Sequence, residues 1–163
     1  MTDIFQGTFE QRDEAAKQLL RIEDSFDLIR RRFMIGGKQA AFYTVDGFLK
    51  GEVSEKVMEF FYKITEEQMP EDFAGFLQQQ IPYLDLMKVA DQEMFVKSVL
   101  SGMSCLMVEG YDIILALDFR EYPSRSVDEP DKDKVLRGSR DGFIESLIPN
   151  MALIRRRIRD TDL

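Results

Sequence analysis

Apolar residues recur at helical spacing in several stretches of the chain. Between residues 52 and 64 the intervals of three and four place one set on a single helical face: Val53, Val57, Phe60, Phe61 and Ile64. Helices are predicted on similar grounds over residues 8–24 and from Pro70 onward. A further helix is predicted after Asp91, which can cap it, and its apolar stripe holds Phe95, Val99 and Met103. The apolar stripe of the helix over residues 8–24 is thin, which predicts that this helix packs loosely against the rest of the domain.

Strand-like runs pair into two hairpins. Residues 27–35 and 38–45 flank Gly36 and Gly37, and residues 104–108 and 111–119 flank Glu109 and Gly110. Glycine at such turns accepts the positive φ angles that a tight hairpin needs. Residues 85–90 add a short strand. Together these elements predict an α/β (α+β) fold, in which a mixed β-sheet of two hairpins plus a short strand is flanked by helices.

A long amphipathic helix is predicted to close the chain. One apolar stripe holds Phe143, Leu147, Met151, Ile154 and Ile158. Asp141 suits the N-cap, and the basic end suits the negative pole of the helix dipole. Pro149 interrupts the middle of this pattern, which predicts a kink or two shorter helices.

Composition narrows the function classes. With 44% apolar residues and 13 Phe in 163 residues, the chain can bury one substantial core, so we expect one domain. The formal charge of −8 argues against nucleic acid as a partner. The absence of His removes the usual general base and the commonest transition-metal ligand, so we expect neither an enzyme nor a cofactor. The longest apolar run, residues 113–117, is too short to cross a bilayer, and the chain as given is expected to be soluble.

A Gly-containing turn before the last helix is the candidate ligand site. Free amide groups at a helix start and two guanidiniums could hold a carboxylate or phosphate, and the residues are Arg137, Gly138, Ser139, Arg140, Asp141 and Gly142. The structural alternative, which we favour, is that the two arginines pair with nearby acids and pin the loop. Those acids, Asp128, Glu129, Asp131 and Asp133, lack the glycine and the terminal Glu of an EF-hand loop, so we expect no metal.

The basic end of the last helix has several interpretations. Arg155, Arg156, Arg157 and Arg159 could form a solvated helix end, a docking surface for an acidic partner, or a patch attracted to an anionic membrane. The acids that follow also favour a salt-bridge network within the chain or between subunits.

Long segments of the chain resemble the GerA-type spore germination receptor A subunits. The resemblance rests on residues 121–125, 129–131, 135–146 and 150–159, and upstream on residues 27–33, 42–48 and 100–102. The Arg-Glu-Tyr-Pro run at residues 120–123 and the Glu-Pro-Asp that follows lean toward the branch called stage V sporulation protein AF.

The resemblance implies a piece of a longer membrane protein. The resemblance covers residues 27–163, which would be a soluble N-terminal α/β domain. Residues 1–26 lie outside the resemblance and are expected to form an N-terminal helical extension. The membrane would be reached through a region absent from this chain, and the full-length protein would lie in the inner membrane of bacterial endospores.

Two functions follow from the resemblance. In the first, the domain acts in subunit assembly and passes a signal to an ion-conducting complex that is a homo-oligomer through the full-length protein. Its network residues would be Glu129, Glu145, Asn150 and the four arginines. In the alternative, the domain binds a germinant, an amino acid or other small anion, at the turn of residues 137–142.

Overall fold

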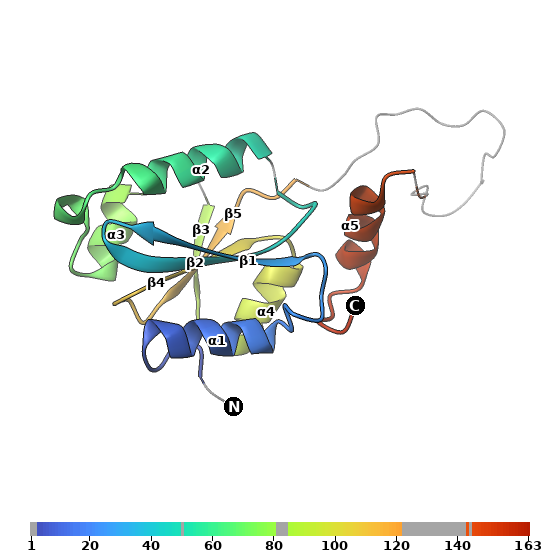
Figure 1. The fold of residues 1–163 in the computed structure, drawn as a ribbon, viewed down its shortest axis with the longest axis horizontal. Coiled ribbons are helices and arrows are strands. Elements are labelled where there is room, and N and C mark those ends of the chain that lie inside the picture. The colour runs from blue at the N-terminus through green and yellow to red at the C-terminus, as the bar shows by residue number, and fades with distance from the viewer. Residues whose placement is uncertain (1–2, 50, 81–84, 122–142, 144) are drawn as a thin grey trace.

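The computed structural model describes residues 3–49, 51–80, 85–121, 143 and 145–163, and shows a sheet between two pairs of helices (Figure 1). The strands, in spatial order, are β1 (Leu28–Ile35), β2 (Lys38–Val45), β4 (Ser104–Val108), β5 (Ile114–Asp118) and β3 (Asp85–Val89). Helices α1 (Phe9–Leu19) and α4 (Gln92–Leu100) cover one face, and α2 (Gly51–Lys63) and α3 (Phe73–Gln80) cover the other. A short 3₁₀ turn, η1 (Glu66–Gln68), precedes α3, and α5 (Leu147–Arg157) lies beside the sheet.

The predicted fold class is confirmed. Both hairpins form, with Gly36 and Gly37 at φ angles of 50° and 76°, and β3 adds to β5 at the far edge. The structure is more specific than our expectation of a mixed sheet, because all the strand pairings between described residues are antiparallel. The hairpins set only their own pairings, whereas the direction of β2 against β4 depends on how the intervening helices return the chain.

Aspartate side chains cap the N-termini of α4 and α3. The Asp91 carboxylate accepts the Met94 N–H at 2.7 Å, so the predicted cap of α4 is confirmed. Helix α3 begins at Phe73 rather than at Pro70. The Asp72 carboxylate accepts the Gly75 N–H at 2.8 Å, which places the cap just before Phe73.

The sheet separates two apolar cores. On the α2 side, aromatic rings pack closely, and the centroids of Phe61 and Phe76 lie 6.5 Å apart in a stacked arrangement. On the other side, α4 contributes Phe95, Val99 and Leu100 to a core that also takes Ala152 from α5. Because β2, β4 and most of β5 are buried on both faces, their side chains read as nearly continuous apolar runs.

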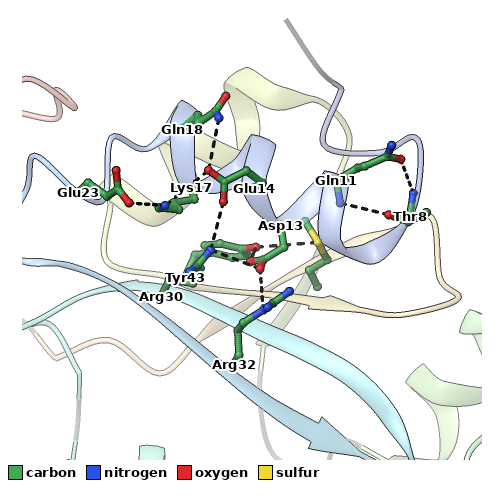
Figure 2. Close-up of polar contacts among 11 residues, drawn as sticks. Thr8, Gln11, Asp13, Glu14, Lys17, Gln18, Glu23, Arg30, Arg32 and Tyr43 are labelled. Carbon is green, nitrogen blue, oxygen red and sulfur yellow. Dashed lines mark hydrogen bonds and ion pairs between the residues drawn. The ribbon is translucent and has the colours of Figure 1, made fainter.

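Helix α1 docks more closely than its thin apolar stripe predicts, because it buries Asp13 beside the sheet. Asp13 accepts a hydrogen bond of 2.6 Å from the Tyr43 hydroxyl and ion pairs from Arg32 at 2.7 Å and Arg30 at 3.4 Å (Figure 2). Burial, with Asp13 nearby, raises the pKa of Tyr43 far above its usual range, so the hydroxyl stays a donor.

The neighbouring charge on α1, Arg12, is also buried. It donates to the carbonyls of Ile4 at 2.9 Å and Tyr111 at 2.8 Å. Helix α1 is thus joined to the N-terminal segment and to the turn before β5 by polar contacts.

Helix α5 differs from its sequence-based prediction in two respects. It is one helix that begins at Leu147, and the kink expected at Pro149 is wrong, since Pro149 lies in the first turn, where no amide hydrogen is needed. The predicted apolar stripe is also wrong as a buried face. Phe143 and Leu147 are 69% and 65% exposed, whereas the buried residues of the helix are Ala152 and Arg155.

We predict that Phe61→Ala lowers the free energy of unfolding by about 3–5 kcal/mol, because the ring is fully buried among other aromatic side chains. Lys56→Ala, on the exposed side of the same helix, should change it by less than about 0.5 kcal/mol. Urea denaturation followed by circular dichroism measures both. A loss for Phe61→Ala as small as that of the control would contradict the described core.

Candidate functional site

The buried ion pair between Arg155 and Asp27 is the most specific polar site in the described residues. Arg155 comes from α5 and Asp27 stands directly before β1, 128 residues away. The guanidinium binds the carboxylate through two atoms: Nε donates to Oδ2 at 2.8 Å and Nη2 donates to Oδ1 at 2.5 Å. The side chains are 0% and 2% exposed, so the pair joins two distant segments out of contact with water.

Other polar groups surround the pair and hydrogen-bond to it. The Ser25 hydroxyl donates to Asp27 Oδ1 at 2.8 Å. Arg155 also donates to the Asp160 carbonyl oxygen and, at 3.3 Å, to the backbone oxygen of Leu163. Arg155 therefore gathers the segment that follows α5 around itself as well as holding the start of β1.

Electrostatics keeps Asp27 charged. Burial by itself raises the pKa of this carboxyl, but the hydrogen bonds from Arg155 and Ser25 and the charge of Arg155 together lower it below its usual value. Moving α5 would separate the two charges and leave each of them buried without a counter-charge. A bidentate pair of this kind therefore stabilises α5 in one position only.

This arrangement joins α5 to the start of β1 through both oxygens of one carboxylate. Both Asp27 oxygens are engaged, so neither is directed toward a substrate. Across the part of the chain that the structure describes, no group of three or more acidic or Cys side chains could hold a metal ion.

The helices of the described residues are all too short or too polar to span a bilayer.

The structure brings together only part of the residues predicted from the sequence. The candidate ligand turn, Arg137 to Gly142, and the network residue Glu129 lie outside the described residues. Glu145 is exposed just before α5, and Asn150 is half-buried in its first turns. Arg156, Arg157 and Arg159 are exposed, unlike Arg155.

Sequence reasoning missed the partner of Arg155. It assigns Asp27 to the first strand and gives it no role, because a carboxylate beside a turn usually faces solvent. The weak available signal was Ser25, whose spacing of two residues suits a local hydrogen bond to Asp27.

The fold is shared with a solved spore protein. The N-terminal domain of the A subunit of the Bacillus megaterium spore germinant receptor GerK3 superimposes with a TM-score of 0.69 at 18% identity, covering 96% of this chain and 57% of that one. At that level of identity the likeness shows the fold.

Sequence comparison shows the family. The family described as Bacillus/Clostridium GerA spore germination protein matches residues 16–163, and the chain therefore belongs to the GerA family. Stage V sporulation protein AF of Bacillus subtilis is 32% identical over 93% of this chain, and spore germination protein A1 of the same organism is 26% identical over 89%. The chain spans 31% and 30% of those relatives, about a third of their length.

We predict that Asp27→Asn costs about 3–5 kcal/mol of stability at neutral pH, because it leaves the Arg155 guanidinium buried without its counter-charge. The folded-state pKa of Asp27 is lowered, so the ion pair's contribution is fully present above the ordinary value of 3.8 and is lost as the pH falls through the folded-state pKa. The difference between the native chain and the variant should therefore shrink in acid.

Urea denaturation from neutral pH to below about 3 follows this difference. Asp24→Asn is the control, because Asp24 forms an exposed pair with Arg21, and it should cost no more than about 1 kcal/mol. A difference between native chain and Asp27→Asn that stays constant over the whole pH range would contradict an ionised pair.

Proposed function

We propose that this chain is a non-enzymatic assembly and signalling domain at the N-terminal side of a GerA-family membrane protein. In this proposal, residues 1–26 are a helical extension and residues 27–163 the α/β domain, which passes a conformational change to an ion-conducting complex in the inner membrane of the endospore. The observation that carries the proposal is the docking of α5 on the sheet through Arg155 and Asp27.

A signalling domain needs a stiff connection between its body and the element that meets the next part of the complex. Helix α5 has one, because displacing it would separate a buried ion pair and expose Ala152, which is 1% exposed. A displacement imposed on α5 is therefore transmitted to the start of β1 rather than absorbed locally. Conversely, a shift of the sheet would move the helix.

The outward side of α5 supplies a surface for a neighbouring subunit. Arg156 and Arg157 are exposed at its C-terminal end and Arg159 just beyond it, while the chain as a whole carries a formal charge of −8. A basic patch on an acidic domain orients the domain toward an acidic partner. The patch is attracted to the acidic surface, and the rest of the domain is repelled by it. Other subunits of a germination complex are the proposed partners.

The charge reversals Arg156→Glu, Arg157→Glu and Arg159→Glu, made together in the full-length protein, should weaken assembly and slow ion release from germinating spores. Because the three side chains are exposed, we expect the unfolding free energy of the 163-residue chain to change by no more than about 1–2 kcal/mol. Co-purification of the complex, ion release and urea denaturation are the measurements.

A matched control reverses three exposed lysines elsewhere, Lys56, Lys88 and Lys97, and should leave assembly unchanged. A loss of stability in the arginine variant with assembly intact would mean that the arginines serve a network within the domain, and the proposal would fail.

Germinant binding is the second candidate function. It is favoured by the described role of the solved structure with the same fold, a spore germinant receptor, and by the two arginines of the turn at residues 137–142. On this alternative the turn holds the carboxylate of an amino acid or another small anion.

An NMR titration of the chain with amino acids and sugars separates the two functions. The assembly function predicts no saturable chemical-shift change at residues 137–143. Saturable shifts confined to those residues, and lost in Arg137→Gln with Arg140→Gln, would instead establish the germinant-binding function.

A further inference from the structure

Strand β1 presents an unpaired backbone edge. It is the first strand in the order of the sheet, and among the described residues only β2 pairs with it. The Asp46 N–H donates to the Asp27 carbonyl at 2.7 Å, so the peptide groups of Asp27 face β2. Peptide groups alternate in direction along a strand, and those of Arg30, Arg32 and Met34 consequently point away from the sheet.

The outward groups of these three residues are available for a further strand. The peptide groups of Leu28 point in the same outward direction, and the Leu28 N–H donates to the Ser25 hydroxyl at 3.4 Å. For Arg30, Arg32 and Met34, no backbone or side-chain partner on the outer side exists among the described residues. Met34 is also 50% exposed, so the edge is open to solvent over its second half.

Helix α2 lies over β1 (Figure 1). A shallow groove lies between the helix and Arg31 of the strand. Its volume is about 470 Å³. Arg31 forms the strand side, and the helix side is lined by Ser54, Glu55, Met58, Glu59, Tyr62 and Lys63. An edge strand beside a helix is the geometry in which an extended peptide adds to a sheet and places alternate side chains in the groove.

The groove holds one cation, Arg31, for which the described residues supply no counter-charge. Arg30 and Arg32, on the opposite face of β1, are engaged by Asp13 (Figure 2), and Lys63 pairs with Glu59 at 2.6 Å. Arg31 has no ion-pair partner within the described ranges. A ligand carboxylate against Arg31 would therefore gain a charge-assisted hydrogen bond.

The rest of the groove selects the neighbouring ligand residue. Tyr62 is 56% exposed and forms most of the apolar surface on the α2 wall, to which Met58 adds the 7% of its side chain that remains exposed. Glu55 lies on the same wall and would repel a second acid placed against the helix. A single acidic residue near the strand, with an apolar residue two positions along, matches this surface better than a run of acids.

A second copy of this chain is a poor occupant. In the register that overlaps the whole strand, antiparallel pairing of β1 with itself would set the Arg30 to Arg32 triplet of one copy against that of the other. Like charges directly opposite each other destabilise a strand pair. The charge of β1 thus disfavours self-association and favours a heterologous acidic strand.

We propose that the edge of β1 and the groove beside α2 bind an extended segment of another protein by strand addition. The segment pairs its backbone with Arg30, Arg32 and Met34, places a carboxylate on Arg31 and rests an apolar side chain on Met58 and Tyr62. The site is separate from the proposed role of α5, because no residue of α5 lines the groove.

The probe is the acetylated and amidated peptide Thr-Glu-Thr-Leu-Thr-Val, in which Glu, Leu and Val share one face of a strand. At saturating peptide, amide hydrogen exchange measured by NMR should slow at Arg30, Arg32 and Met34. It should change little at Ile29, Arg31 and Phe33, whose peptide groups face β2. This alternation distinguishes strand addition from general contact.

Two peptide sets and two variants sharpen the test. Of two peptides N-methylated at alternate residues, only the one whose methyl groups face β1 should lose binding. Arg31→Glu should weaken binding of the Glu peptide by about tenfold or more and strengthen binding of a peptide with Lys in place of Glu. Lys56→Glu, outside the groove, should leave both affinities unchanged.

Three results would overturn the proposal. One is the absence of slowed exchange at Arg30, Arg32 and Met34 with saturating peptide. Another is protection of these amides that appears without peptide and grows with protein concentration, which would assign the edge to a second copy. The last is protection in the free monomer at every concentration, which would mean that this chain covers its own edge.

Discussion

The position of α5 depends on one charged contact. Arg155 and Asp27 are both withdrawn from water, and neither is tolerable there without the other, because the cost of desolvating a charge is recovered only by a well-placed counter-charge. That requirement gives the helix one location and one rotation against the sheet. It also explains why the buried face of α5 contains an arginine and a small alanine while several of its larger apolar residues remain in contact with water.

The same principle operates at α1. Its buried side consists of Phe9 and small alanines together with Arg12 and Asp13; Asp13 has counter-charges on β1, whereas Arg12 donates to the backbone carbonyls of Ile4 and Tyr111. The two apolar cores supply most of the burial, whereas the charged contacts decide how the peripheral helices sit on them. Buried polar contacts of this kind favour a single arrangement, since a shifted helix would leave them unsatisfied.

Family membership and structure bear on function in different ways. The chain belongs to the GerA family and spans about a third of the length of its curated relatives, and the role that we propose for it lies in contacts with neighbouring subunits. Two surfaces of the domain are suited to such contacts. The basic end of α5 offers charge, and the edge of β1 offers backbone hydrogen bonds beside an open groove.

Local features of the sequence determined most of the elements. The hairpins followed from glycine-containing turns between apolar runs, and α2 and α4 from spacing and from the Asp91 cap, because these signals depend only on residues close in the chain. The anion-binding turn at residues 137–142 stays a prediction. Tertiary structure alone decided that Arg155, Arg12 and Asp13 are buried, that Asp27 matters, and that Pro149 lies in a first turn. The apolar periodicity of a sequence predicts that charged side chains face solvent. A charged side chain is buried only where a polar or charged partner satisfies it, and here those partners come from distant parts of the chain.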